Sequence, residues 1–340
     1  MKKTILSALV AVFGFATQAT AQSSMLATLN HEGTVSTFYG ATALREAHAA
    51  AAHGDIITLS SGTFVSVNIT KAVTLRGAGM EVDTLSGTEP TVISGNFNIQ
   101  IADSVSQRLV IEGVYNNHKI TCSGTINNAM FLKNRFYQFS YLEQGILKNA
   151  SFIHSRISDF IALNTGASAS FINCVIEDPI SQSESNSNYE FMNCVIKFND
   201  NYTDKVMSSS YKNCLIYSHT NANYAKIPSS CNVYNCIGFY HSGIFNNIPN
   251  STNVFITDMK TIFKTYAGQS LQKLDSENFE LTDAAKTKYL GTDGTQVGIH
   301  GGMLPFDSTP SNPQITKCNV ASKSTADGKL SVDIEVKAAE

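Results

Sequence analysis

"FINCVI" at residues 171–176, "FMNCVI" at 191–196 and "YKNCLI" at 211–216 are copies of one hexapeptide, placed 20 residues apart. Weaker copies are "FLKNRF" from Phe131, "FIHSRI" from Phe152 and "VYNCIG" from Val233, so that successive copies lie 21, 19, 20, 20 and 22 residues apart. Self-similarity at this period is typical of a solenoid, in which each repeat forms one coil and buries its apolar side chains against its neighbours.

The third and fourth positions of the hexapeptide predict how each coil turns. Asn is frequent at the third position, and Asn tolerates the left-handed backbone conformation that a bend between two short strands requires. Coils stack at about 4.8 Å, so we expect the Asn amides to bond to one another and the Cys side chains to form a buried column of small apolar groups. This predicted ladder comprises Asn173, Cys174, Asn193, Cys194, Asn213, Cys214, Asn235 and Cys236. A disulfide framework among the seven cysteines is the alternative.

A leucine-rich repeat is the competing solenoid, because it has a similar period and an Asn or Cys in its consensus. It needs a regular Leu pattern and often a helix in each repeat. The intervals at 165–170 and 179–190 are rich in Ser, Asn and Gly, which are poor helix formers. Coils of short strands and turns are therefore favoured.

The segment "ATALREAHAAAAHGDIITLSSGTF" at 41–64 predicts an amphipathic helix from about Thr42 to Ala52, a turn at 53–55, a strand at Ile56–Leu59 and a turn at Ser61-Gly62. "KAVTLRGAG" follows at 71–79. This opening resembles that of the pectate-lyase-like right-handed parallel β-helix superfamily, in which a helix caps the first coil. The matching residues are Leu44, Ala47, Gly54, Asp55, Ile57, Gly62, Phe64, Val73, Leu75, Gly77 and Gly79. The resemblance implies an all-β, right-handed parallel β-helix with an N-terminal capping helix, but no particular chemistry, because that superfamily includes lyases, hydrolases, esterases, adhesins and tailspikes.

The two ends of the chain predict its organisation. Lys2 and Lys3, an apolar run over 5–16 and the small residues at 19–21 are typical of a secretory signal peptide, which implies export to the periplasm, the medium or the cell surface. Gly and Pro accumulate over 298–313 and predict the end of the β-helix. "QITKCNV" and "GKLSVDIEVKA" then predict two strands around Asp327-Gly328, a tail that resembles the endings of exported Bacteroidetes proteins. The predicted organisation is a signal peptide at 1–21, an N-terminal segment with the capping helix at 22–54, the parallel β-helix at 55–302 and a linker with a β-hairpin tail at 303–340.

Composition narrows the possible partners. The formal charge of −3 disfavours nucleic acid, which needs clustered Lys and Arg. The apolar run near the start is too short for a transmembrane helix, so we expect no membrane span. No paired Cys spacing of a zinc site occurs, so we predict no metal and no cofactor. The sequence does not indicate an oligomeric state.

Superposing the repeats gathers polar residues into outer columns. Lys133 and His154 share the third position, Arg135 and Arg156 share the fifth, and Asp159 and Asp178 lie two positions past the motif. Counterparts on adjacent coils should lie about 5 Å apart. The candidate ligand-binding face comprises Lys133, Arg135, Tyr137, Tyr141, His154, Arg156, Asp159, Glu177 and Asp178.

Three functions are compatible with that face. Our leading hypothesis is a noncatalytic exported β-helix that binds a polysaccharide, a cell-surface glycan or another surface partner on this lateral face. The alternative is a polysaccharide lyase or glycoside hydrolase that uses Arg135, Arg156, Asp159 and Asp178. No Asp-Asp doublet and no acidic calcium-site cluster is found, so no catalytic residue of the superfamily is carried over. A structural or adhesive spacer is the second alternative, in which Arg156 simply pairs with Asp159 or Asp178 on a solvated face.

Overall fold

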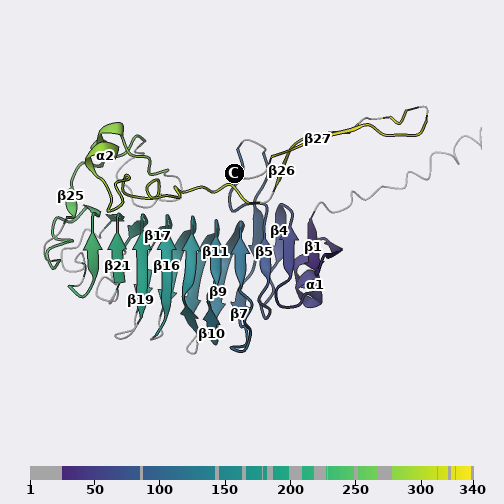
Figure 1. Ribbon diagram of the computed structural model, residues 1–340, viewed down its shortest axis with the longest axis horizontal. Helices are drawn as coiled ribbons and strands as arrows, with labels where there is room; N and C mark the ends of the chain where they lie inside the picture. Colours follow the sequence, from purple (N-terminus) through teal and green to yellow (C-terminus); the bar gives the residue numbers. More distant parts are fainter. Residues whose placement is uncertain are drawn as a thin grey trace, which may run out of the picture.

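A computed structural model of the protein shows a parallel β-solenoid of about 8 turns (Figure 1). This confirms the predicted fold class. The structure describes residues 25–84, 87–141, 145–162, 166–177, 179–181, 187–198, 209–217, 227, 229–248, 252–265, 278–311, 313–320, 323–325 and 327–337. The predicted signal peptide lies outside these residues and stays a prediction.

Two long sheets form the walls of the solenoid. The first sheet contains, in spatial order, β2 (Thr34–Tyr39), β1 (Leu26–His31), β3 (Ile56–Leu59), β5 (Thr74–Arg76), β8 (Val110–Glu112), β11 (Met130–Leu132), β14 (Ala150–Ile153), β16 (Ser168–Ile172), β19 (Asn188–Met192), β21 (Ser209–Lys212) and β23 (Asn232–Tyr234). The second sheet contains β4 (Gly62–Val65), β6 (Thr91–Ser94), β9 (Val114–Cys122), β12 (Arg135–Tyr141), β15 (Arg156–Ala162), β17 (Val175–Glu177), β20 (Val195–Lys197), β22 (Leu215–Tyr217), β24 (Ile237–Phe239) and β25 (Val254–Ile256), with β7 (Phe97–Ile99) beside β9 and β18 (Pro179–Ser181) beside β15. A short third sheet pairs β10 (Thr125–Asn127) with β13 (Ile146–Lys148).

The hexapeptides stack in the predicted register. Phe131, Phe152, Phe171 and Phe191 are direct partners on successive parallel strands of the first sheet, followed by Tyr211. Their rings lie nearly parallel, with centroids 4.6 to 4.9 Å apart. The aromatic column therefore repeats at the strand spacing and fills the interior of the solenoid.

The predicted bend at the third hexapeptide position is confirmed. Positive φ angles occur at Lys133 (54°), His154 (50°), Asn173 (49°), Asn193 (54°), Asn213 (59°) and Asn235 (51°). Gly113, with φ of 66°, takes the same place in the preceding coil. We call these seven residues the corner column. Each turns the chain from a strand of the first sheet into a strand of the second.

The Cys column is also confirmed, and it has a second role. The six cysteines whose side chains the structure describes are buried and form no disulfide, so the disulfide alternative finds no support among them. In the column of Cys174, Cys194, Cys214 and Cys236, each thiol also bonds to the backbone. The Cys194 Sγ lies 3.3 Å from the carbonyl oxygen of Phe171, and the Cys214 Sγ accepts from the Cys194 amide at 3.4 Å. The prediction of purely apolar packing was therefore incomplete.

The N-terminal end is capped as predicted by a helix, α1 (Ala43–Ala50), which buries Leu44, Ala47 and His48. The first coil strand, β3, has the predicted bounds. His48 Nε2 accepts from the Thr70 amide at 3.3 Å, and burial lowers the pKa of this imidazole to about 4. The antiparallel β1–β2 hairpin, which continues the first sheet beyond β3, was not predicted.

The C-terminal residues form an outer layer. β25 is the last solenoid strand, and the chain then passes through a 3₁₀ turn at Met259–Thr261 and α2 (Asp283–Lys288) and runs back over the solenoid (Figure 1). We predicted that the β-helix extends to residue 302. The returning stretch, however, packs outside the solenoid. A second hydrophobic core lies between the layer and the second sheet and includes Val175, Val195, Leu215, Ile237, Phe263, Phe279, Leu281, Val297 and Ile299.

The predicted tail hairpin is present. β26 (Gln314–Val320) and β27 (Val332–Lys337) are antiparallel and extend away from the solenoid (Figure 1). Gly328 has a φ of 78°, in keeping with the predicted turn at Asp327-Gly328. In the part of the chain that the structure describes, no helix combines the length and the apolar composition needed to cross a bilayer.

Candidate functional site

A segment of the outer layer, residues 290–311, follows the corner column along the solenoid, and we call it the strap. Near its start, Asn235 Nδ2 donates to the Leu290 carbonyl at 2.9 Å. Further along, Asn173 Nδ2 donates to the carbonyls of Ile299 and Gly301 at 2.7 and 2.8 Å. The corner side chains therefore bind this strap in addition to turning the coils.

This contact changes the predicted Asn ladder. Asn213 Nδ2 donates to Asn193 Oδ1 at 3.0 Å, which is the kind of bond that stacking predicts. Asn213 Oδ1, however, accepts from the Thr292 amide of the strap at 2.8 Å. The amides of Asn173 and Asn235 also bond to strap carbonyls rather than along the ladder, because the strap presents backbone groups to the corner.

The prediction that Lys133 and His154 lie on an open face was wrong. Their exposed fractions are 8% and 6%, because the end of the strap covers them. Lys133 Nζ donates to Asp307 Oδ2 at 2.7 Å and to the Thr309 carbonyl at 2.6 Å. His154 Nε2 donates to the Leu304 carbonyl at 3.0 Å.

The pKa values at this contact follow from burial and charge. Burial lowers the pKa of His154 below its ordinary value. Burial alone would raise the pKa of Asp307, but the hydrogen bond from Lys133 and its positive charge bring it below the ordinary value. Lys133 and Asp307 are therefore an ion pair within the molecule, not groups presented to a ligand.

Arg156 is also held within the molecule. Its Nε lies 3.2 Å from Glu81 Oε1, and its guanidinium lies 5.2 Å from the centroid of the Phe306 ring in the strap. Glu81 belongs to the connection between β5 and β6 and was not among the predicted partners. Glu177 pairs with Lys197 on the next coil, with 3.4 Å between Nζ and Oε2. Asp178 and the side chain of Tyr141 lie outside the described residues.

The remaining candidates lie on the outer side of β9, β12 and β15. Arg135 is the register partner of Arg156, as predicted, and of Tyr115. Its guanidinium lies 5.0 Å from the centroid of the Tyr115 ring. Tyr137 is 57% exposed. A second column aligns Lys119, Gln138 and Asp159, all partly exposed. We call Tyr115, Lys119, Arg135, Tyr137, Gln138 and Asp159 the lateral patch.

Tyr115, Lys119 and Gln138 were missed by the sequence reasoning. β9 belongs to a coil without the hexapeptide, so the repeat gave no alignment for Tyr115 and Lys119. A register shift between Phe136 and Gln138 also displaces the partners of β12 by one residue. Gly113 could have provided the missing alignment. It takes the corner position that Lys133 takes in the following coil, so the residues after Gly113 align with those after Lys133.

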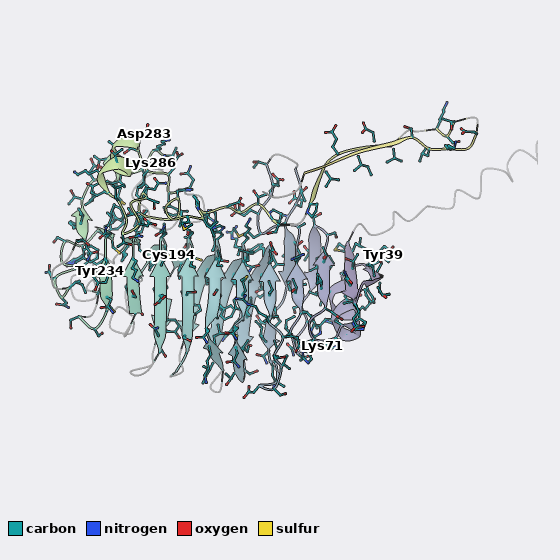
Figure 2. All side chains as sticks on the ribbon, in the orientation of Figure 1. Tyr39, Lys71, Cys194, Tyr234, Asp283 and Lys286 are labelled. Carbon is teal, nitrogen blue, oxygen red and sulfur yellow. The ribbon has the colours of Figure 1, made fainter. Side chains whose placement is uncertain are left out.

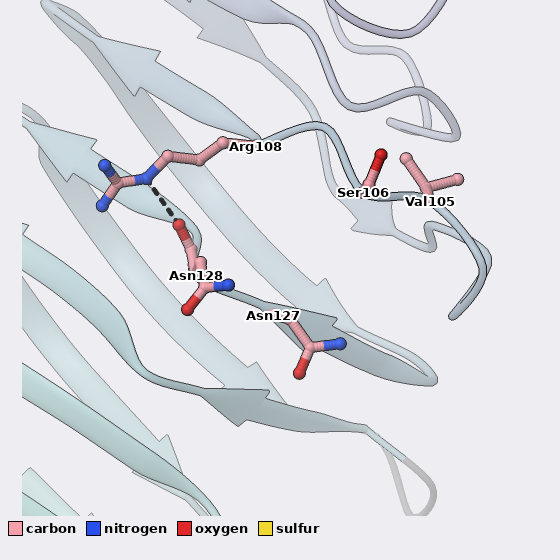
Figure 3. A pocket seen from close by; sticks show the side chains of 5 residues that line it. All are labelled: Val105, Ser106, Arg108, Asn127 and Asn128. Atoms are coloured by element: carbon pink, nitrogen blue, oxygen red, sulfur yellow. Dashed lines mark hydrogen bonds between the residues drawn. The ribbon is translucent and has the colours of Figure 1, made fainter.

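A separate groove opens beside the turn between β10 and β11 (Figure 3). It has a volume of about 590 Å³ and is lined by Val105, Ser106, Arg108, Asn127 and Asn128. Arg108 Nε donates to the Asn128 carbonyl at 2.6 Å. The guanidinium and the amides could bind hydroxyl or carboxylate groups, but the described residues that line the groove include no aromatic ring.

Among the described residues, no three His, Cys, Asp or Glu side chains lie where they could hold a metal ion together. No protein-family model, no curated protein and no solved structure matches this chain. The solenoid therefore rests on the structure alone, and the resemblance to the pectate-lyase-like superfamily stays a prediction beyond that coarse fold.

Proposed function

We propose that the protein is an exported, noncatalytic β-solenoid that binds carbohydrate through the lateral patch. The observation that carries this proposal is the exposed ring of Tyr137 among guanidinium, amide and carboxylate groups. An amphipathic aromatic ring offers an apolar surface for the face of a sugar, and the polar groups around it can bond to hydroxyls.

The position of the patch also supports binding to an extended ligand. Its residues lie on strands of stacked coils, so side chains in one column recur at about 4.8 Å. Arg135 is already held against Tyr115, which reduces the conformational entropy that binding would cost. A rigid row of this kind suits a chain of sugar units better than a single small molecule.

We favour binding over catalysis because two residues of the predicted face, Arg156 and Glu177, are paired with other side chains of the protein. Arg156 is paired with Glu81 and stacked on Phe306, and Glu177 is paired with Lys197. A lyase or hydrolase would have to rely on Arg135 and Asp159 instead. The enzyme alternative and the spacer alternative are separate outcomes of the experiment below.

The test is binding to a panel of neutral and uronate polysaccharides by glycan array and calorimetry. Tyr137→Ala should weaken binding about tenfold, which corresponds to roughly 1.4 kcal/mol, because the stacking surface is lost. Tyr234→Ala is the matched control, since Tyr234 is also exposed but lies on the first sheet. Arg108→Ala tests whether the groove contributes.

Equal affinity of the wild type and Tyr137→Ala would remove the patch as the site. A loss in Arg108→Ala alone would place binding in the groove. Appearance of unsaturated products or new reducing ends would favour the enzyme alternative, and the absence of both binding and turnover would favour the spacer.

A further inference from the structure

β2 forms the open edge of the first sheet at the N-terminal end of the solenoid. It is the outermost strand in the sheet order and pairs with β1 alone in the described part of the chain. Figure 2 places Tyr39, the last residue of β2, at this end of the molecule. Such an edge offers backbone groups to another strand.

The register of the β1–β2 hairpin shows which backbone groups are offered. The Gly40 amide donates to the Met25 carbonyl at 2.9 Å, in line with the pairing of Leu26 with Tyr39. In an antiparallel ladder, hydrogen-bonded positions alternate. Thr34, Ser36 and Phe38 therefore direct their amides and carbonyls to β1, and Val35, Thr37 and Tyr39 direct theirs outward.

Within its own six residues, β2 has none of the features that usually protect an edge strand against pairing. The sequence "TVSTFY" contains no charged residue and no proline, and β2 has no bulge in its pairing with β1. Val35 and Tyr39 are 61% and 53% exposed on the face away from α1, where Thr37 also lies. An uncharged edge of six residues, rich in β-branched and aromatic side chains, is well suited to strand addition.

We propose that β2 pairs antiparallel with β2 of a second copy, on a twofold axis at Thr37. Directly opposed residues must lie on the same face of the sheet, which restricts the possible registers. In the register centred on Thr37, Thr37 faces Thr37 and Val35 faces Tyr39. All the outward-facing residues of both strands then form hydrogen-bonded pairs, which no other register achieves.

The side chains support this register. Aromatic with β-branched and Thr with Thr are favourable cross-strand pairs. β2 carries no charge, so two identical edges do not repel each other. The two solenoids would lie end to end, with the first sheet continuous across both.

The test is the mass of the purified protein by light scattering and sedimentation velocity over a concentration series. The wild type should give twice the protomer mass of 36.8 kDa, less any cleaved leader. Thr37→Lys should be a monomer, because two ammonium groups would oppose each other on the axis. Thr28→Lys is the matched control, since Thr28 is the β1 partner of Thr37 and does not face the second copy.

A mixture of Thr37→Lys with Thr37→Glu should restore the dimer, because opposite charges then meet at the axis. This also shows that neither variant has failed to fold. A monomeric wild type, a Thr37→Lys protein that remains dimeric, or a mixture that stays monomeric would each overturn the proposal.

Discussion

From Lys133 onward, the side chain of the residue that follows each corner bonds its coil to the neighbouring one, whatever its chemical type. Asn134 Oδ1 accepts from the Val114 amide at 3.1 Å, and its Nδ2 donates to the Ile111 carbonyl at 2.8 Å. Ser155 Oγ accepts from the Asn134 amide at 3.2 Å. Cys174 Sγ lies 3.5 Å from the Ser155 amide. An amide, a hydroxyl and a thiol at this position therefore all accept a hydrogen bond from the backbone of the preceding coil.

This equivalence predicts how Cys174 tolerates substitution. Cys174→Ser should change the free energy of unfolding by less than about 1 kcal/mol, because a hydroxyl can accept from the Ser155 amide and donate to the Phe152 carbonyl. Cys174→Ala should cost about 1 to 3 kcal/mol, because the buried Ser155 amide loses its acceptor. Urea denaturation followed by circular dichroism measures both.

Cys122 is the control for that prediction. It is fully buried in β9, and the described residues make no hydrogen bond to its thiol. There Ser should be worse than Ala, because the new hydroxyl would be buried without a partner. If Ser and Ala rank in the same order at both sites, the bonding role of Cys174 is wrong.

Among the elements, the strap is held by polar contacts at its end and by apolar contacts in its middle. Its end is anchored by Lys133, which contacts Asp307 and Thr309. Its middle is anchored by apolar contacts of Val297 and Ile299 in the second core. The end of the strap should therefore open more readily than the middle.

Lys133→Met should speed amide hydrogen exchange over residues 303–311 and leave exchange in the solenoid strands unchanged. Met has the same left-handed backbone cost as Lys at this corner, so only the polar contacts are lost. Hydrogen exchange with mass spectrometry measures the difference, and Lys148→Met, at an exposed position of β13, is the control. Unchanged exchange in this segment would show that Lys133 does not hold the strap.

Acid should act on the same contact. The pKa of Asp307 is lowered in the folded protein, so its contribution to stability is present above the ordinary value of 3.8. That contribution is lost as the pH falls below this value and through the folded pKa. Exchange in the strap of the wild type should therefore approach that of Lys133→Met in strong acid.

At the scale of the whole molecule, the solenoid should behave as a stack of separable coils. Deleting residues 174–193 joins Asn173 to Cys194 and keeps the hexapeptide in phase. The shortened chain should retain its β-sheet circular dichroism, because each coil contacts only its neighbours. The body would shorten by about 4.8 Å while the strap would not, so the strap could no longer contact Asn213 and Asn173 together.

Limited proteolysis of that variant should cut within the strap, whereas the wild type should resist. Deleting half a coil, residues 174–183, is the control, because it brings corner positions opposite strand positions and should prevent folding. Equal behaviour of the two deletions would contradict a stack of separable coils.

The coils, their corners, the capping helix and the tail hairpin could all be predicted from local sequence patterns. Phe171 contacts Phe191, and Asn193 contacts Asn213, because a repeat places each residue against its own copy in the next coil. One period of the sequence therefore predicts the contacts between successive coils. The bounds of β3 followed from a local pattern of the same kind.

The layer that covers the solenoid and the open edge of the first sheet could not be predicted in this way, because they depend on contacts between distant segments. Lys133 and Asp307 are 174 residues apart, and Arg156 and Glu81 are 75 apart, in segments that share no period. The change from Arg135 and Arg156 to Val175 at the same position was the one local sign of a covering layer. This change from Arg to Val predicts that the position is buried. It does not predict which segment covers it, because contacts between segments of unlike sequence depend on the fold of the whole chain.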